Sequence, residues 1–222
     1  MLNLNTLIPV RNQHSHVLRV DDSTAWFDIK KPRYNLAIMS RKASGLLESA
    51  VQELMHSSFS GIDMVLEQPK NWPEAIVLLV GCKTTSNWIK LEPLVNDISM
   101  CCELFVTITG AQTVRLSLKV ITTDACRKFH IDGYTYRLLC SYYGPGTEWV
   151  YNENVNRKYL GLGENNQIIK DWSAIQRINT FDIAILKGEL PHQRNGKGIV
   201  HRSPPIQHTN DKRLVLRIDY TS

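Results

Sequence analysis

The chain has 222 residues, of which 43% are hydrophobic and 21% are charged, and its formal net charge is +5. This composition is typical of a soluble globular protein and excludes a largely disordered chain. No apolar run is long enough to cross a bilayer and the N-terminus lacks an export signal, so we expect no membrane partner and a cytoplasmic location. The basic residues are scattered, which suits an anionic substrate but gives no strong signal for nucleic acid.

The first 110 residues (1–110) are expected to form a mainly helical supporting region. Residues 1–35 predict an irregular or strand-bearing lead-in. From Ser40 to Leu54, leucine and valine recur at helical spacing, with Ser40 as the N-cap. A second amphipathic helix is predicted from about Ser86 to Leu104. Between the two helices, the apolar run from Pro73 to Gly81 fits either a buried strand or a short helix.

The second half of the chain, residues 111–222, changes to a period of two, which predicts β-strands. Short strands separated by Gly, Pro and Asn are typical of a sandwich or a jelly-roll barrel. The fold class is therefore α+β, with the barrel in the C-terminal half and the helical annex before it. Asn195-Gly196 is a hairpin turn signal. The predicted strands are 113–123, 126–132, 135–144, 181–188, 198–205 and 212–220.

A polar segment at residues 151–180 interrupts these strands. It has room for about one helix and several loops. A segment of this length inside a barrel is often a lid or a binding loop, so we expect a lid-like insertion, with a surface elaboration as the alternative.

Three residues have the chemistry of a metal site. His130 and Asp132 are two apart in a predicted strand, so their side chains leave the same face. His201 lies in a later strand and is the best candidate for a third ligand. Two imidazoles and one carboxylate form the arrangement typical of non-haem Fe(II) oxygenases. The same set suits Zn(II) with water as the fourth ligand, and each histidine taken alone is more often an ordinary strand residue.

The last predicted strand could bind the co-substrate of such an oxygenase. Arg213 and Arg217 share one face of the segment RLVLRID. A 2-oxo acid that chelates iron leaves a far carboxylate, which requires a planar, bidentate partner such as arginine. We rank Arg213, which follows His201 by 12 residues, ahead of Arg217. Tyr142 could donate a hydrogen bond to the same acid, although strand tyrosines more often serve as packing.

Two features near the candidate ligands have alternative interpretations. Cys126 would share a strand face with His130 and could make the site a zinc site, but we expect it to be buried packing. The five cysteines are odd in number and form no C-x-x-C pair, which argues against a disulfide framework. The segment GPGTEW, from Gly144 to Trp149, is most simply a tight turn. Its Thr147, Glu148 and Trp149 could instead lie at the mouth of the barrel.

The order His130-x-Asp132, His201, Arg213 resembles the double-stranded β-helix of Fe(II)- and 2-oxoglutarate-dependent dioxygenases, over about residues 112–220. The stretch CRKFHIDGYTYRLLCSYYGPGTEWV, with ILKG and HRSPP, is similar to a bacterial family known as domain of unknown function 1826. The first resemblance implies Fe(II) and 2-oxoglutarate as cofactors, with the two histidines and the aspartate on the metal and Arg213 on the co-substrate. The second implies little about the substrate, which could be a small molecule or a protein, but its members tend to accompany zinc-homeostasis genes.

The sequence therefore leaves three hypotheses. The first is an oxygenase of the Fe(II)/2-oxoglutarate type that hydroxylates an unknown substrate. The second is a non-redox zinc-binding protein of zinc homeostasis. The third is a barrel that has lost catalysis and serves as a binding module, against which the retained triad counts.

Overall fold

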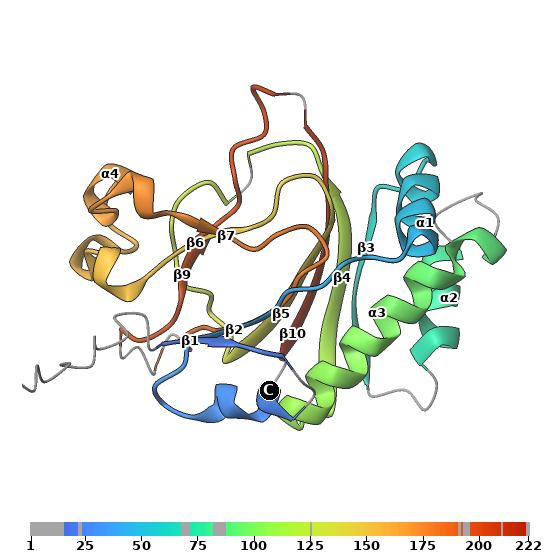
Figure 1. Ribbon diagram of the computed structural model, residues 1–222, viewed down its shortest axis with the longest axis horizontal. Coiled ribbons are helices and arrows are strands. Elements are labelled where there is room, and N and C mark those ends of the chain that lie inside the picture. The colour runs from blue at the N-terminus through green and yellow to red at the C-terminus, as the bar shows by residue number, and fades with distance from the viewer. Residues whose placement is uncertain are drawn as a thin grey trace, which may run out of the picture.

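The computed structural model describes residues 16–220 apart from 22–23, 68–71, 82–87, 125, 191, 193–195 and 210. The fold is mixed α/β, with one large sheet, one small sheet and three longer helices. Figure 1 shows the helices α1–α3 to one side of the large sheet and the small sheet to its other side. None of the helices within the described ranges is long and apolar enough to cross a membrane.

The large sheet has seven strands in the order β1-β2-β8-β5-β10-β4-β3. All neighbours are antiparallel except β1 and β2, which run parallel. Strands from both halves of the chain therefore share one sheet. The strands are β1 (Val17–Arg19), β2 (Leu36–Met39), β3 (Gly61–Glu67), β4 (Thr113–Ile121), β5 (Tyr136–Tyr143), β8 (Ile183–Lys187) and β10 (Arg213–Tyr220).

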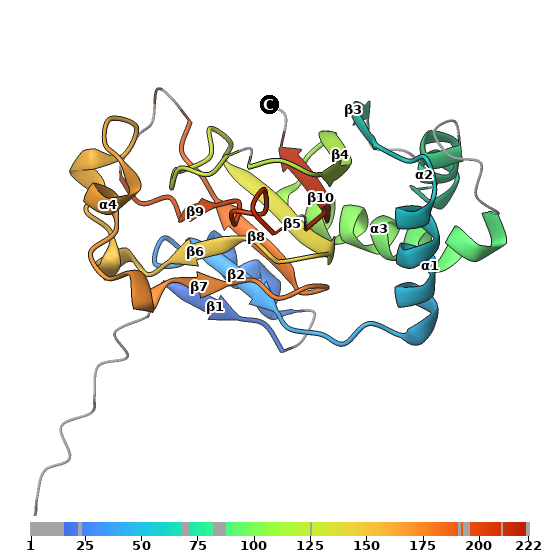
Figure 2. The same ribbon diagram turned by 90° about the horizontal axis from the view of Figure 1, so that it is seen from above.

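The small sheet has three antiparallel strands in the order β7-β6-β9. They are β6 (Glu148–Val150), β7 (Gln176–Arg177) and β9 (Val200–Arg202). Side chains of both sheets meet in one apolar cluster, in which Trp149 and Ile199 pack with Leu139 and Val215 of the large sheet. The two sheets thus lie face to face, and Figure 2 shows this pairing from above.

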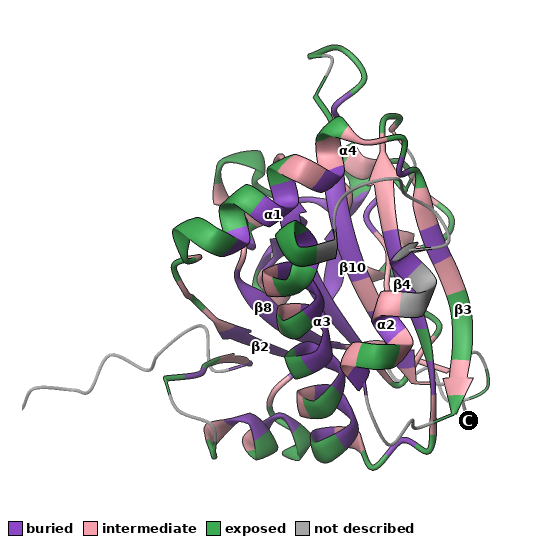
Figure 3. Cartoon of the chain, turned by 90° about the vertical axis from the view of Figure 1, so that its right-hand side faces the viewer, coloured by how far each residue is buried: buried purple, intermediate pink, exposed green. Residues whose placement is uncertain are grey.

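Three helices cover the opposite face of the large sheet. They are α1 (Gly45–His56), α2 (Trp72–Gly81) and α3 (Trp88–Thr109). Their buried faces join alternate residues of β5 and β10 in the main apolar core, and Figure 3 shows their outer faces exposed. This arrangement follows from the period-two strands, since one face of each strand is left to the helices and the other to the small sheet.

The structure refines the predicted helices. The N-cap of α1 is Ser44, whose hydroxyl accepts a hydrogen bond from the Leu47 amide, so Ser40 was the wrong cap. The ambiguous run at 73–81 is helical, as α2. Helix α3 continues to Thr109, where Gly110 with φ of 74° ends it, and its expected start at Ser86 lies outside the described residues.

Residues 151–180 form an outer layer on the small sheet. They contain three short 3₁₀ helices, the short helix α4 and β7, and their apolar side chains pack with Val150 and Val200. These two valines alternate with Trp149 and Ile199, so the layer covers the face of the small sheet that points away from the large one. The short elements are η2 (Asn152–Asn154), η3 (Arg157–Tyr159), α4 (Asn165–Ile168) and η4 (Trp172–Ala174), and a fourth 3₁₀ helix, η1 (Ala25–Lys30), precedes β2.

Two predicted β features differ from the structure. The run 126–132 is not a regular strand, because only His130 forms a bridge, to His201. Cys126 instead lies in a turn with φ of 59° and is exposed, so the expectation of buried packing was wrong. The strands on either side of the expected hairpin turn, β8 and β9, lie in different sheets, and Asn195 of that turn is outside the described residues.

Candidate metal centre

The two histidines predicted as ligands are joined by backbone pairing. His130 and His201 form an isolated antiparallel bridge, and each amide donates to the other's carbonyl at 3.0 Å. Directly opposed residues of such a pair point their side chains to the same face. Their ring centroids are accordingly 4.6 Å apart. A residue from the loop before β5 and a residue of β9 are thereby brought together from distant parts of the sequence.

Asp132 completes the group. Its Oδ2 lies 3.3 Å from Nε2 of His201, and its Oδ1 lies 3.7 Å from Nε2 of His130. One possible ligand atom from each of the three residues lies within 4.8 Å of the other two. Asp132 and His201 are buried, whereas the His130 side chain is 35% exposed. The group is therefore closed on one side and reachable from the other.

The hydrogen bonds of the imidazoles determine which nitrogen is available. Nδ1 of His130 lies 2.8 Å from the Lys128 carbonyl oxygen, and Nδ1 of His201 lies 3.3 Å from that of Ile199. A carbonyl only accepts, so Nδ1 carries the proton in each ring. In the neutral rings both Nε2 atoms then hold a lone pair directed at Asp132. Such backbone partners commonly orient histidines that bind metals.

The carboxylate of Asp132 has one satisfied and one unsatisfied oxygen. Oδ1 accepts a hydrogen bond of 2.5 Å from Nη1 of Arg137, whereas buried Oδ2 has no hydrogen-bond partner among the residues that the structure describes. Oδ2 and Nε2 of His201 are two acceptors at 3.3 Å, which repel unless a proton or a metal ion lies between them. The donor set and this unpaired oxygen therefore fit a divalent cation.

Charge coupling within the group shifts its pKa values. Burial alone would raise the pKa of Asp132, but His201, His130 and Arg137 together hold it well below its usual range. Burial alone would lower the pKa of His130, but the nearby Asp132 carboxylate and the hydrogen bond to the Lys128 carbonyl raise it. Asp132 is thus ionised at neutral pH, as a metal ligand must be.

Arg137 was not singled out from the sequence, and it positions Asp132. Its Nε and Nη2 donate to both oxygens of Asp219 on β10, at 2.5 and 2.9 Å, while its Nη1 donates to Asp132. A guanidinium with two carboxylates is rigidly oriented. In the sequence, the position of Arg137 near the site was indicated only by strand alternation, which places it on the same face as Leu139.

Arg213 lies in the same pocket and has a different environment. Its side chain is 1% exposed. It donates to four neutral oxygens, those of the Pro145 carbonyl (2.7 Å) and of the hydroxyls of Ser203, Thr147 and Ser141 (3.1–3.3 Å). Among the described residues no carboxylate pairs with it, and burial lowers its pKa to about 10. A buried cation without a counter-ion is costly, so this environment suits an anionic ligand.

The pocket that joins these residues is small, with a volume of about 50 Å³. His130, His201 and Arg137 line it on the side of the candidate metal ligands, and Arg213 and Arg217 line it along β10. Thr147 of the GPGTEW segment also lines it, whereas Trp149 packs between the sheets. Glu148 points away and accepts hydrogen bonds from Arg177 and Arg202. The segment is thus both a turn and, through Thr147 alone, part of the pocket.

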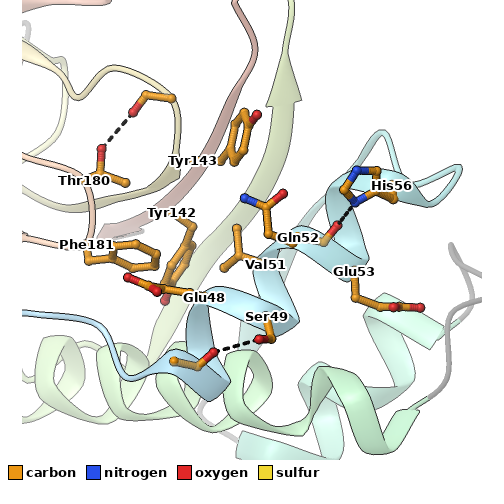
Figure 4. A pocket seen from close by; sticks show the side chains of 12 residues that line it. Glu48, Ser49, Val51, Gln52, Glu53, His56, Tyr142, Tyr143, Thr180 and Phe181 are labelled. Atoms are coloured by element: carbon orange, nitrogen blue, oxygen red, sulfur yellow. Dashed lines mark hydrogen bonds between the residues drawn. The ribbon is translucent and has the colours of Figure 1, made fainter.

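The structure corrects the prediction for Tyr142. This residue is buried on the helix-facing side of β5, and its hydroxyl donates to Asp97 of α3 at 2.6 Å. Figure 4 shows it beside Val51 and Phe181, in a larger open groove of about 800 Å³. Because successive strand residues point to opposite faces, Ser141 faces the candidate metal centre and Tyr142 cannot.

Comparisons with known proteins give the family and the fold. The sequence model of the family described as "Protein of unknown function (DUF1826)" matches residues 21–219. No curated protein matches the chain. Among solved structures, dioxygenase for auxin oxidation 1 from Arabidopsis thaliana, in a binary complex with 2-oxoglutarate, is similar with a TM-score of 0.51 and 10% identity. That match covers 93% of this chain and 92% of the other, and it shows a shared fold.

Two further structures match at lower TM-scores. A prolyl-4-hydroxylase from Pseudomonas putida has a TM-score of 0.46 and 8% identity, and the match covers 90% of this chain and 99% of that one. A Caulobacter crescentus protein assigned to the 2OG-Fe(II) oxygenase family has a TM-score of 0.42 and 15% identity, with coverage of 92% and 85%. At these scores we draw no argument from either.

Proposed function

The chain belongs to the family described as protein of unknown function DUF1826, and from the geometry of its pocket we propose that it is an oxygenase of the Fe(II)/2-oxoglutarate type. One observation carries the proposal. Both histidines of a two-histidine, one-carboxylate group line one small pocket together with a buried arginine that has no carboxylate partner among the described residues. The first fits a divalent metal ion, and the second fits a far carboxylate of a metal-chelating acid.

His130, Asp132 and His201 would hold the metal in this proposal. Both imidazoles present Nε2, since Nδ1 of each is bound to a backbone carbonyl. Fe(II) with 2-oxoglutarate, when bound, would supply the oxidising power to insert one atom of O₂ into a C–H bond, while the other atom enters succinate as CO₂ is released. Arg137 would keep Asp132 ionised and oriented without touching the metal.

Arg213 would bind the far carboxylate of 2-oxoglutarate. The three hydroxyls around it accept from its guanidinium, so their own protons are free to point at the same carboxylate. An anion there would remove the cost of the buried, uncompensated charge. Arg213 lies under the turn formed by Gly144 and Pro145, where a Cβ on Gly144 would lie 2.0 Å from the Lys212 carbonyl. Glycine is thus required for this close approach.

For the fold, we infer that the two facing sheets are the major and minor sheets of a distorted double-stranded β-helix over about residues 112–220. The shared apolar cluster between the sheets and the fold similarity to the Arabidopsis dioxygenase support this. Within this proposal, residues 1–110 support the barrel with α1–α3 and contribute β1–β3 to its large sheet. The insertion at 151–180 would stabilise the small sheet from outside.

Metal analysis and co-substrate titration test the proposal. Protein purified without oxygen should bind one Fe(II) per chain, and adding 2-oxoglutarate should produce a visible charge-transfer band. The band should disappear in His201→Ala, and in Arg213→Gln at 2-oxoglutarate concentrations that saturate the wild type. Lys90→Gln, on the far side of α3 where Lys90 pairs with Glu53, is the matched control and should change nothing. Tightly held zinc without any response to 2-oxoglutarate would contradict the oxygenase proposal and favour the zinc-binding alternative.

A further inference from the structure

Arg217 is the second arginine of the pocket, and its surroundings differ from those of Arg213. Both residues face the pocket from β10, four positions apart, which places their backbones about 13 Å apart along the strand. Arg213 reaches toward β5, where it donates to Ser141. Arg217 reaches toward β4 on the other side, where its Nη2 lies 3.4 Å from Oγ of Ser117. The two guanidinium groups therefore have different partners on opposite sides of β10, Ser141 of β5 for Arg213 and Ser117 of β4 for Arg217.

Arg217 is partly exposed and its charge is not compensated. Ser117 is the hydrogen-bond partner that the structure gives it, and no ion pair involves it within the described ranges. Arg217 also lines the pocket that contains His130 and His201. A partly exposed cation that lines this pocket is available to a ligand that enters from solvent.

The strands next to Arg217 add further positive charge. Ser117 pairs with Arg217 in register, and Asp63 of edge strand β3 pairs with Ser117. Arg115 and Lys119 flank Ser117 on the same face of β4, and both form ion pairs with Asp63. The hydrogen bond from Arg115 lowers the pKa of Asp63 to about 2, so it is ionised at neutral pH.

Arg115, Lys119 and Arg217 therefore bring three positive charges to the face formed by β10, β4 and β3, on which β3 carries two carboxylates, Asp63 and, at the end of the strand, Glu67. The nearby Asp219 does not change this balance, because it is bound through both oxygens to Arg137. A surface with this excess of positive charge attracts anions and raises their local concentration. The face continues from the pocket to the open edge of the large sheet, where β3 ends the strand order.

We propose that the substrate to be oxidised carries a carboxylate or phosphate group, and that Arg217 binds this group while Arg213 binds the co-substrate. This inference rests on the proposed function and adds to it the chemical class of the substrate and a residue that selects it. Arg115 and Lys119 steer the anion toward Arg217.

The test uses the anaerobic Fe(II) form saturated with 2-oxoglutarate, whose visible band reports on ligands that bind near the metal. The probes are two anions, benzoate and phenyl phosphate, and two neutral counterparts, benzamide and benzyl alcohol. We expect at least one anion to shift the band, with an affinity that falls as salt is added, and neither neutral compound to do so. The anion that acts also distinguishes a carboxylate substrate from a phosphate ester.

Substitutions distinguish the roles of Arg213 and Arg217 in binding the two ligands. Arg217→Gln should weaken the binding of the effective anion by about tenfold or more and leave the dissociation constant of 2-oxoglutarate within about twofold. Arg217→Lys should restore part of the anion affinity, which a purely structural role would not predict. Arg213→Gln should weaken 2-oxoglutarate binding instead, and Lys90→Gln should affect neither.

Three results would overturn the inference. They are an equal response to the neutral probes, no response to either anion, or a loss of 2-oxoglutarate affinity in Arg217→Gln as large as that in Arg213→Gln. Failure of the proposed function itself has a different signature, since the wild-type protein would then show no 2-oxoglutarate band before any probe is added.

Discussion

The two faces of the large sheet differ in whether every buried charged group has a charged partner. On the helix side, Arg41 donates to both oxygens of Asp97 at 2.5 and 2.7 Å, and Tyr142 donates to the same carboxylate. On the side of the small sheet, and within the described part of the chain, Arg213 donates only to neutral oxygens and Asp132 keeps one oxygen unpaired. Buried polar groups normally have hydrogen-bond or ion-pair partners. Buried groups that lack such partners and gather on one face therefore indicate the side where ligands bind.

The comparison predicts opposite stability effects for two buried arginines. Arg41→Met should lower the free energy of unfolding by about 3 kcal/mol or more, because it leaves Asp97 buried without its cation. Arg213→Met should change it by no more than about 1 kcal/mol in the ligand-free protein, because it leaves no carboxylate unpaired. Urea unfolding followed by circular dichroism measures both. A larger loss for Arg213→Met than for Arg41→Met would show that Arg213 is a structural residue.

Arg137 tests how far the metal group depends on its support. Arg137→Lys keeps the charge but cannot bind Asp219 through two nitrogens and reach Asp132 at the same time. We expect the affinity for Fe(II) or for Co(II) as a probe to fall about 10- to 100-fold, the range for partners of metal ligands. Competition with a chromogenic chelator measures it. An unchanged affinity would mean that Asp132 is held by its backbone alone.

Tyr142→Phe tests the assignment of this residue to the helix side. Loss of its hydrogen bond to Asp97 should lower the free energy of unfolding by about 1.5 kcal/mol. The dissociation constant of 2-oxoglutarate should not change, since the hydroxyl lies on the other face of β5. Thermal unfolding and titration of the same preparation give both values. Weaker 2-oxoglutarate binding with unchanged stability would show that Tyr142 contributes to the 2-oxoglutarate site.

The smallest expected effect is a pH dependence of the stability of the metal-free protein. The pKa of His130 is raised on folding, so its contribution to stability is fully present below about pH 6.5, its unfolded value, and is lost as pH rises through the folded pKa. The depressed pKa of Asp132 adds stability that is lost only in acid. Bound metal should reverse the trend at neutral pH, because it requires the unprotonated imidazole. Thermal unfolding from pH 6 to 8, with and without Co(II), measures the pH dependence of stability for the metal-bound and the metal-free protein. His130→Gln should remove the pH dependence of the metal-free protein.

Much of the candidate site was predictable because its elements are local. The spacing of His130 and Asp132 indicates a shared direction even though the run 126–132 is not a regular strand, since a single bridge at His130 is enough to orient both side chains. The alternation of the last strand separates Arg213 and Arg217 from Leu214 and Leu216, and β10 keeps this separation. Strand 135–144 could not be interpreted in this way, because YRLLCSYY carries tyrosine and leucine on both faces, and Tyr142 was assigned to the wrong one.

By itself, then, the sequence determined which residues could share a strand face and which segments alternate, because these depend on spacing along one stretch of backbone. Only the tertiary structure decided which face of each strand meets the helices and that His201 pairs with His130. It also decided that Arg137 forms ion pairs with carboxylates, whereas Arg213 donates to neutral oxygens. Those outcomes depend on contacts between residues far apart in the chain. Among the described residues these contacts leave Arg213, Arg217 and one oxygen of Asp132 without a charged partner, and no single segment of the sequence predicts this.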